Sequence, residues 1–521
     1  MDTILSQGIK QKFSLNPLTK KYFISMNPPQ LQDNRGDADR LRNAVIPLLN
    51  NKNLEIPLSL LHTIPNICRA GQWQVTVTAA ELNGYSRLIS VEPGDSPLNF
   101  GIAVDIGTTT VVAYLVDLVT GKTLGTVSSY NSQIKYGETI LDRIQFAYSK
   151  DNLRELQVTT MENLNSLISD LIWKNNLDRE KITACTLSGN TTMIHLVLGL
   201  DPSGICQEPY IPVVNSPGYF RAADLELMIN GNGIVYCLPS IGSYVGGDVI
   251  AGVVVSGMNK EENISMLVDI GTNGEIVLGN SEWLVASAGA AGPALEGGVV
   301  KWGMRATTGA ISQVKINHVT KQVFYKTIGN TNPSGLCGSG LVDCIAELLL
   351  AGIIDRAGKF RDNTNDFIIV PSSETAHGED IIISQNDIKN LIRTKGAVNA
   401  SVEVLLESVG CSVEQIKFFY AAGAFGNYID KESAVTIGLY PDLPRDQIIK
   451  IGNSSGEGAK LALLSQEKRQ EMEEVAKKIT YFEMNANQDF MNKYTAGLFL
   501  PHSNLDAYPT IKARLHKNSV K

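Results

Sequence analysis

The segment GIAVDIGTTTVVAYLVDLV, residues 101–119, places an aspartate and a glycine at the end of one apolar run and a threonine-rich turn before the next. The segment MLVDIGTNGEIVLGN, residues 266–280, repeats this order, with its aspartate 164 residues after the first. TLGTVSSY (123–130) and EWLVASA (282–288) follow as third strands, so each copy predicts a three-stranded meander. Two meanders, each followed by helical patterns, predict an α/β fold with two duplicated lobes.

The residues of the first turn suit phosphate chemistry. Asp105, at a strand end, can hold a magnesium ion through water. Gly107 lets the backbone turn tightly and approach a ligand with no Cβ in the way. Thr108, Thr109 and Thr110 offer hydroxyls and backbone N–H groups to phosphate oxygens.

The second turn offers the same groups in the same order, namely Asp269, Gly271, Thr272, Asn273 and Gly274. Two such hairpins would hold the β- and γ-phosphates of a nucleotide from both sides. An ordinary hairpin turn is the alternative for either copy alone. The occurrence of both copies at strand ends argues against that alternative.

A third signal is FFYAAGAFGNYI, residues 418–429, where an apolar strand runs into small residues. Gly423 and Gly426 would let an adenine ring lie against the backbone, and Asn427 is expected to cap the following helix. A tight strand-to-helix turn without a ligand remains the alternative at this segment.

These three elements, in this order, resemble the phosphate-1 hairpin, phosphate-2 hairpin and adenosine loop of the actin-like ATPases. Further segments narrow the resemblance: GETILDRI (137–144), LSGNTTMIHLVLGL (187–200), PSIGSYVGGDVIAG (239–252), ASAGAAGPALEGG (286–298), SGLCGSGLVD (334–343) and AAGAFGNYID (421–430). Over residues 20–505 the chain resembles the ATP-dependent reductive activators of corrinoid proteins.

The resemblance implies an architecture and an activity. Residues 1–20 would be a linker, residues 21–98 a small α+β middle domain, and residues 99–521 a duplicated, two-lobed actin-like ATPase domain. The activity would be ATP hydrolysis coupled to the one-electron reduction of Co(II) to Co(I) in a corrinoid protein of a methyltransferase system. ATP and Mg²⁺ would be the cofactors, and the protein would be a homodimer.

The resemblance also implies residue roles. Asp105 and Asp269 would hold Mg²⁺. Asp248 would orient the attacking water, with a helix N-cap as its alternative role. Lys395 would contact the ribose, with a solvated lysine as the alternative. Ser287 and the small residues after it would let a corrinoid ring approach, with a packed loop as the alternative.

Cysteine spacing departs from the family. Typical members carry an iron–sulfur module, but the seven cysteines here form no CxxC motif and no tight four-cysteine run. Buried free thiols are the simpler expectation. We therefore expect no iron–sulfur cluster on this chain as written, and electrons from a separate low-potential donor or from a ferredoxin module that was removed.

Composition limits the other partners. The net charge of −8 argues against a nucleic-acid or anionic-membrane surface. No apolar run approaches the roughly 18 to 20 residues that span a bilayer, and no secretory signal opens the chain, so a cytoplasmic location is expected. The alternative functions are a small-molecule kinase, an actin-like nucleotide switch, and an activator of a radical or dehydratase enzyme.

Overall fold

The computed structural model describes residues 13–271, 274–289, 295, 298–484 and 489–519. The chain forms two compact units. The N-terminal unit comprises Lys10–Val254 and Ser455–Lys477, and the C-terminal unit comprises Val255–Ser454 and Lys478–Lys521. Each unit is built around its own six-stranded sheet.

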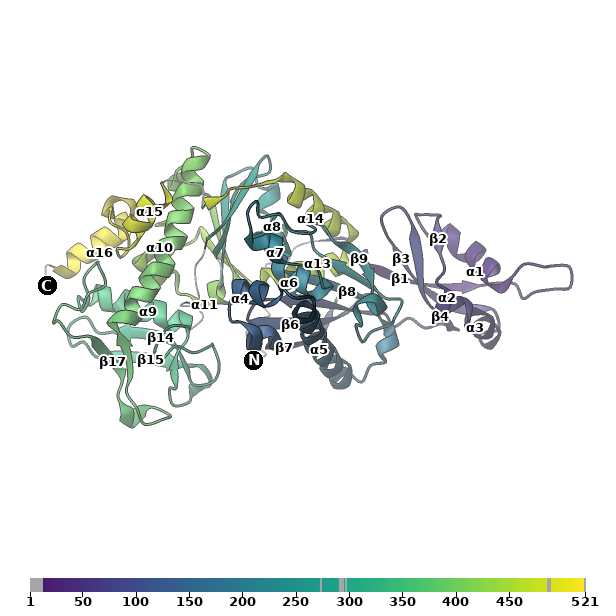
Figure 1. Cartoon of the computed structure of the whole chain (residues 1–521), viewed down its shortest axis with the longest axis horizontal. Helices are drawn as coiled ribbons and strands as arrows, with labels where there is room; N and C mark the ends of the chain where they lie inside the picture. The colour runs from purple at the N-terminus through teal and green to yellow at the C-terminus, as the bar shows by residue number, and fades with distance from the viewer. Residues whose placement is uncertain (1–12, 272–273, 290–294, 296–297, 485–488, 520–521) are drawn as a thin grey trace. The chain divides into compact units, whose positions relative to one another are not determined.

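The N-terminal unit opens with a four-stranded sheet of order β1-β3-β4-β2. Its strands are β1 (Thr19–Ser25), β2 (Leu54–Glu55), β3 (Gln74–Glu81) and β4 (Ser86–Pro93). Helices α1 (Asp37–Val45), α2 (Leu58–Leu61) and α3 (Ile64–Ala70) accompany them (Figure 1). Leu41 of α1, Ile64 of α3 and Val75 of β3 are buried in one apolar cluster, so sheet and helices form a small α+β layer pair.

The six-stranded sheet of this unit has the order β7-β6-β5-β8-β10-β9. Its strands are β5 (Phe100–Ile106), β6 (Thr110–Asp117), β7 (Thr123–Tyr130), β8 (Ile182–Gly189), β9 (Gly218–Arg221) and β10 (Ile234–Cys237). β5, β6 and β7 form the expected antiparallel meander, and β8 and β10 extend the sheet in parallel from β5.

Helices cover both faces of this sheet, which explains why β5 is apolar except for Asp105 near its carboxyl end. Ile102, Val104 and Ile106 share a core with α5 (Lys150–Asn175). Gly101 lies on the opposite face by strand alternation, where a Cβ would lie 2.9 Å from the side chain of Leu463.

The C-terminal unit repeats this architecture in a sheet of order β20-β19-β11-β12-β13-β21. Its strands are β11 (Ser265–Ile270), β12 (Gly274–Gly279), β13 (Leu284–Gly289), β19 (Phe418–Ala422), β20 (Ile448–Gly452) and β21 (Ile479–Tyr481). Here too a central strand, β11, has an antiparallel meander on one side and two parallel strands on the other. The predicted duplication is therefore confirmed at the level of strand order and direction.

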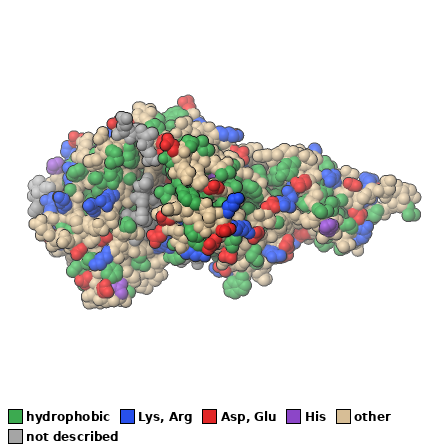
Figure 2. All heavy atoms as spheres, in the orientation of Figure 1, with side chains coloured by type: hydrophobic (Ala, Val, Ile, Leu, Met, Phe, Trp, Pro, Cys, Tyr) green, Lys and Arg blue, Asp and Glu red, His purple; other side chains and the backbone are tan. Residues whose placement is uncertain are grey.

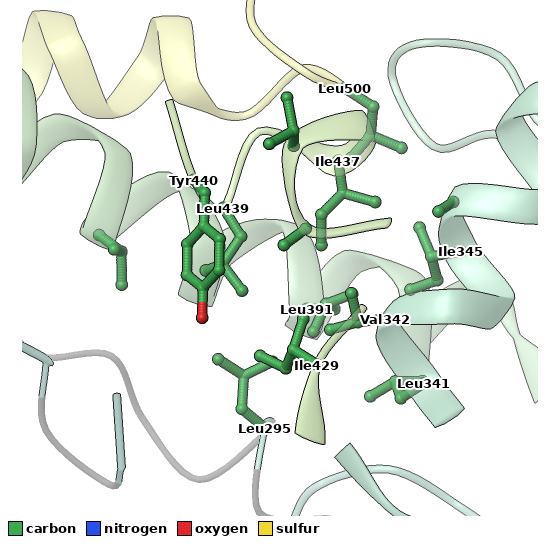
Figure 3. Close-up of a cluster of buried hydrophobic side chains, with 14 of the residues drawn as sticks. Leu295, Leu341, Val342, Ile345, Leu391, Ile429, Ile437, Leu439, Tyr440 and Leu500 are labelled. Atoms are coloured by element: carbon green, nitrogen blue, oxygen red, sulfur yellow. The ribbon is translucent and has the colours of Figure 1, made fainter. Parts of the chain in front are cut away.

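Helices α9 (Gly338–Leu350), α10 (Gln385–Ser408) and α12 (Lys431–Ile437) contribute to the core of the C-terminal unit. Leu341 and Ile345 of α9 are buried in one cluster with Leu391 of α10 and Ile437 of α12 (Figure 3). A fully buried leucine contributes about 1.5 to 3 kcal/mol relative to an exposed one. The same unit also contains β14 (Ala310–Ile316), β15 (Val323–Thr327), β16 (Gly335–Leu336), β17 (Asp366–Val370), β18 (Ile381–Ser384), α11 (Gly423–Tyr428), α15 (Phe490–Gly497) and α16 (Pro509–Ser519).

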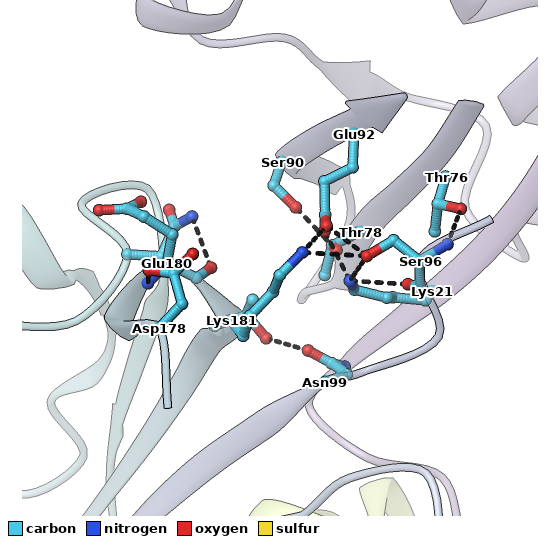
Figure 4. Close-up of polar contacts among 12 residues, drawn as sticks. Lys21, Thr76, Thr78, Ser90, Glu92, Ser96, Asn99, Asp178, Glu180 and Lys181 are labelled. Atoms are coloured by element: carbon cyan, nitrogen blue, oxygen red, sulfur yellow. Dashed lines mark hydrogen bonds and ion pairs between the residues drawn. The ribbon is translucent and has the colours of Figure 1, made fainter. Parts of the chain in front are cut away.

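Polar groups join the small sheet to the six-stranded sheet of the same unit (Figure 4). The Glu92 carboxylate accepts from Lys21 Nζ at 2.5 Å and also from Lys181 Nζ. Burial raises the pKa of Glu92, but the hydrogen bonds from both lysines outweigh it and lower the pKa. Beneath this bridge, Thr183 Oγ1 donates to Asn99 Oδ1 at 2.6 Å and contacts Thr19 Oγ1 at 2.6 Å.

All seven cysteines are free thiols. Five are buried, as expected, and Cys206 and Cys411 are half-buried. Among the described residues, no group of three or more His, Cys, Asp and Glu side chains is placed to hold a metal ion. No helix in the described part of the chain combines the length and apolarity needed to span a membrane. Basic and acidic side chains are interspersed on the face drawn in Figure 2.

Candidate active site

The first predicted hairpin turn connects β5 to β6. Gly107 N donates to Thr110 O at 3.0 Å, and a Cβ on Gly107 would lie 2.7 Å from the same oxygen. Only glycine fits this close approach. Asn131 holds the turn from the side, because its backbone N–H donates to Thr109 O and its side-chain amide donates to Gly107 O, both at 2.9 Å.

A buried arginine supports the turn from below. Arg143, fully buried on α4 (Ile140–Phe146), donates from Nη2 to Thr108 O at 2.6 Å and from Nε to Gly137 O at 2.9 Å. Burial lowers the pKa of Arg143 to about 10, so the guanidinium stays charged at neutral pH. Asn190, after β8, donates to the Thr108 hydroxyl at 3.2 Å. Neither Arg143 nor Asn190 was assigned a role from the sequence, although both fall in segments that carry the resemblance.

Asp105 lies at the carboxyl end of β5 beside its register partner on β8, Ser188. Its Oδ1 accepts a hydrogen bond from Ser455 Oγ at 2.7 Å. Ser455 is in the first turn of α13 (Ser454–Leu464), and its hydroxyl also lies 2.9 Å from Ser188 Oγ. A carboxylate at a strand end, fixed by a hydroxyl, has the oxygen chemistry that Mg²⁺ prefers.

Asp248 belongs to the same cluster. It is the second residue of α8 (Gly247–Ser256), so it lies inside the first turn, and the alternative of a helix N-cap is wrong. Burial raises the pKa of its carboxyl group well above the usual range, and the charge of Asp105 adds to this effect. A buried carboxyl group with a raised pKa beside a second carboxylate is typical of a catalytic acid or base.

The second predicted hairpin connects β11 to β12 in the C-terminal unit. Asp269 pairs with Glu275 across this hairpin, and Gly274 opens β12. A Cβ on Gly423 would lie 2.5 Å from Asp269 Oδ1, so the small residue after β19 gives this carboxylate its space.

The predicted phosphate contacts around this hairpin remain predictions. Thr272 and Asn273 lie outside the described residues, and Gly271 is the last described residue before them.

The predicted adenosine segment differs from expectation in one respect. Gly423, with φ of +82°, starts α11 (Gly423–Tyr428), so Gly426 and Asn427 lie within this helix. Asn427 therefore does not cap the next helix. Asp430 does, because its side chain accepts from Ser433 N at 3.0 Å at the start of α12. A Cβ on Gly426 would lie 3.3 Å from the backbone of Ala421, which keeps this turn close to β19.

Lys395 and Ser287 are both buried, whereas the alternatives for them were a solvated lysine and a packed loop. Lys395 is fully buried on α10, and its Nζ donates to Phe499 O at 2.6 Å and to Pro501 O. Burial lowers the pKa of Lys395 to about 7. The solvated alternative is therefore wrong, and a ribose contact stays a prediction. Ser287 is buried on β13 rather than in a loop.

The structure thus gathers Asp105, Asp248 and Thr108 at one end of the N-terminal sheet, and Asp269 and Gly423 at the matching end of the C-terminal sheet. The Asp105 carboxylate, held by the Ser455 hydroxyl at the carboxyl end of β5, offers the oxygen ligand that Mg²⁺ prefers. The residues present therefore fit Mg²⁺ bound with a nucleotide phosphate.

Comparison with known proteins identifies three consecutive family regions. Residues 8–97 match the RACo linker region, residues 100–261 the RACo middle region, and residues 263–512 the C-terminal domain of RACo, the ASKHA domain.

Three relatives agree with these matches. A corrinoid activation enzyme, RamQ, from Eubacterium limosum is 34% identical over 79% of this chain and 74% of its own length. A [Co(II) methylated amine-specific corrinoid protein] reductase from Methanosarcina barkeri is 26% identical over 77% of this chain and 76% of its own length. A solved structure of a reductive activator for corrinoid, iron–sulfur protein matches with a TM-score of 0.90 at 38% identity, over 97% of this chain and 83% of that one.

Proposed function

Because the chain belongs to the RACo family, we propose that it hydrolyses ATP to drive the one-electron reduction of Co(II) to Co(I) in a corrinoid protein of a methyltransferase system. The observation that carries this proposal is the matched placement of Asp105 and Asp269 at the ends of equivalent strands in two duplicated sheets. One relative is a corrinoid activation enzyme and another is a Co(II) corrinoid protein reductase, so a corrinoid protein is the class of partner that we propose.

Different residues of the proposed site would bind Mg²⁺ and the phosphates of ATP. Asp105 and Asp269 would hold Mg²⁺, which neutralises phosphate charge when bound. The backbone N–H groups and hydroxyls at Thr108, Thr109 and Thr110 would bind phosphate oxygens.

Other residues of the proposed site act on the water and on the nucleoside. Asp248 would orient the attacking water and accept its proton. In the C-terminal unit, Gly271, Thr272, Asn273 and Gly274 would repeat the phosphate contacts, and Gly423, Gly426 and Asn427 would frame the adenine.

Coupling to cobalt requires that ATP stabilise the complexes with the two cobalt states unequally. Moving a two-state equilibrium from 1:99 to 99:1 takes roughly 5.5 kcal/mol. For a one-electron couple, a tenfold change in the equilibrium constant corresponds to about 59 mV in reduction potential. The shift above therefore corresponds to a change of roughly 240 mV in the reduction potential.

The test uses the full chain, a corrinoid protein poised as Co(II), and a low-potential donor. The absorption band of Co(I) should appear only when ATP is present, and calorimetry should give different affinities for the Co(II), Co(I) and methylated states. Co(I) formation that is independent of ATP, or equal affinity for all three states, would contradict the proposal. ATP-dependent phosphorylation of a small molecule would instead favour the kinase alternative.

Further predictions from the resemblance accompany this proposal. They are the domain boundaries at residues 1–20, 21–98 and 99–521, the homodimer, the separate electron donor, and the cytoplasmic location. Light scattering of the purified chain tests the homodimer directly, since a monomer mass would contradict it.

A further inference from the structure

Two serine hydroxyls connect a sheet strand and a helix to the Asp105 carboxylate. Ser455 Oγ donates to Asp105 Oδ1 at 2.7 Å and lies 2.9 Å from Ser188 Oγ. A serine hydroxyl has a single proton to donate. Because Ser455 gives its proton to Asp105, Ser188 must be the donor to Ser455. The hydrogen bonds therefore run in one direction, from Ser188 to Ser455 to Asp105.

The helix that carries Ser455 is fixed closely against its neighbours. A Cβ on Gly456 would lie 2.7 Å from the Tyr114 ring on β6, and a Cβ on Gly458 would lie 2.3 Å from the Cβ of Ala251 on α8. Thr186 Oγ1 on β8 donates to Ala459 O at 2.8 Å. The first turn of α13 is thus held in place from the sheet and from the helix that carries Asp248.

We propose that Ser455 is a positioning residue for the Asp105 carboxylate and ties its orientation to the placement of α13. Ser455 is 6% exposed, so water does not replace its hydrogen bond easily. Without this bond the carboxylate would rotate away from the orientation in which it binds Mg²⁺. The inference deepens the proposed function, since it concerns the same phosphate site.

The main test is Ser455→Ala. We expect the Mg²⁺ concentration for half-maximal ATP hydrolysis to rise about tenfold and kcat to fall about 10- to 100-fold, as for loss of a buried hydrogen bond to a charged group. Calorimetry of Mg²⁺ binding in the presence of ADP should show the same loss of affinity without turnover. Ser455→Thr keeps the hydroxyl and should restore most of the Mg²⁺ affinity.

Thr186→Val is the matched control. It removes a buried hydrogen bond between the same sheet and the same helix but leaves Asp105 untouched. We expect it to lower the melting temperature about as much as Ser455→Ala and to leave the Mg²⁺ dependence unchanged. Ser188→Ala removes only the first donor of the chain and should weaken Mg²⁺ affinity by about threefold or less.

Equal Mg²⁺ dependence in Ser455→Ala and Thr186→Val would overturn the positioning role. A parent chain that binds Mg²⁺ and ADP but reduces no corrinoid protein would contradict the proposed function and leave this inference standing. A parent chain that binds neither Mg²⁺ nor ADP would contradict both.

Discussion

Gly458 on α13 and Ala251 on α8 approach so closely that a Cβ on Gly458 would lie 2.3 Å from the Cβ of Ala251. The two helices that cross at this point carry Ser455 and Asp248, which both act on Asp105. The crossing therefore fixes how the carboxyl groups of the N-terminal unit face one another, and it tolerates no larger residue.

We predict that Gly458→Ala lowers both stability and turnover. The added methyl must push the helices apart, and overpacking of this kind costs about 1 to 3 kcal/mol. Thermal unfolding and ATP hydrolysis measure the two effects. Gly231→Ala is the control, because the nearest atom to its new Cβ would be 3.9 Å away. Equal melting temperatures for the two variants would show that α8 and α13 adjust without strain.

We predict that Asp248→Asn lowers kcat of ATP hydrolysis by about 10² to 10⁴, the usual contribution of a general base. Binding of Mg–ADP should be unchanged or tighter, because the variant removes a negative charge beside Asp105. Steady-state kinetics and calorimetry separate these effects. A loss of nucleotide affinity with unchanged kcat would assign Asp248 to binding instead.

Substitution of Arg143 should loosen the first phosphate turn. Lysine cannot reproduce the forked contacts to Thr108 O and Gly137 O, so Arg143→Lys leaves a buried carbonyl unpaired. We expect a loss of about 1 to 3 kcal/mol in stability and a raised KM for ATP. Arg154→Lys, at an exposed arginine on α5, should leave both unchanged. A normal KM in a destabilised Arg143→Lys would mean that the arginine serves folding alone.

The buried Lys395 predicts a specific dependence of stability on pH. Its pKa is about 7 in the folded chain and 10.5 when unfolded, so between these values the unfolded chain binds more protons. The free energy of unfolding contributed by Lys395 should therefore rise as pH increases from 7 to 10. Lys395→Met should abolish this part of the rise, measured by denaturant titration at each pH.

Lys389→Met is the control for this experiment, because Lys389 is exposed on the same helix. Its pH dependence should match that of the parent chain. A parallel pH dependence in the parent and Lys395→Met would mean that Lys395 keeps its proton in the folded chain.

The sequence predicted those features that depend on local pattern. Apolar runs separated by turn residues within 101–119 and 266–280 predicted both meanders, and the matched aspartates predicted the duplication. The sequence did not predict that Ser455 would meet Asp105, because 350 residues separate them and nothing local marks the pair. Asn427 was wrongly predicted as a cap for a local reason, because Gly423 turns the chain directly into α11 and Asp430 caps the next helix.

Lys395 shows a different limit. A lysine on a helix is usually solvated, and only the later chain segment, with Phe499 O and Pro501 O, supplies the acceptors that let it be buried. Similarly, Arg143 is recognisable as a support of the phosphate turn only once α4 is folded against Thr108.

The Glu92 bridge sets a limit on how the gene can be shortened in the laboratory. A fragment that starts at β5 would lack Glu92, the carboxylate that Lys181 contacts, and would lack Asn99 and Thr19, the partners of the buried Thr183 hydroxyl. Each buried polar group left without a partner costs about 1 to 3 kcal/mol. Expression designs for the six-stranded sheet should therefore begin before Thr19, so that the fragment carries its own small sheet with it.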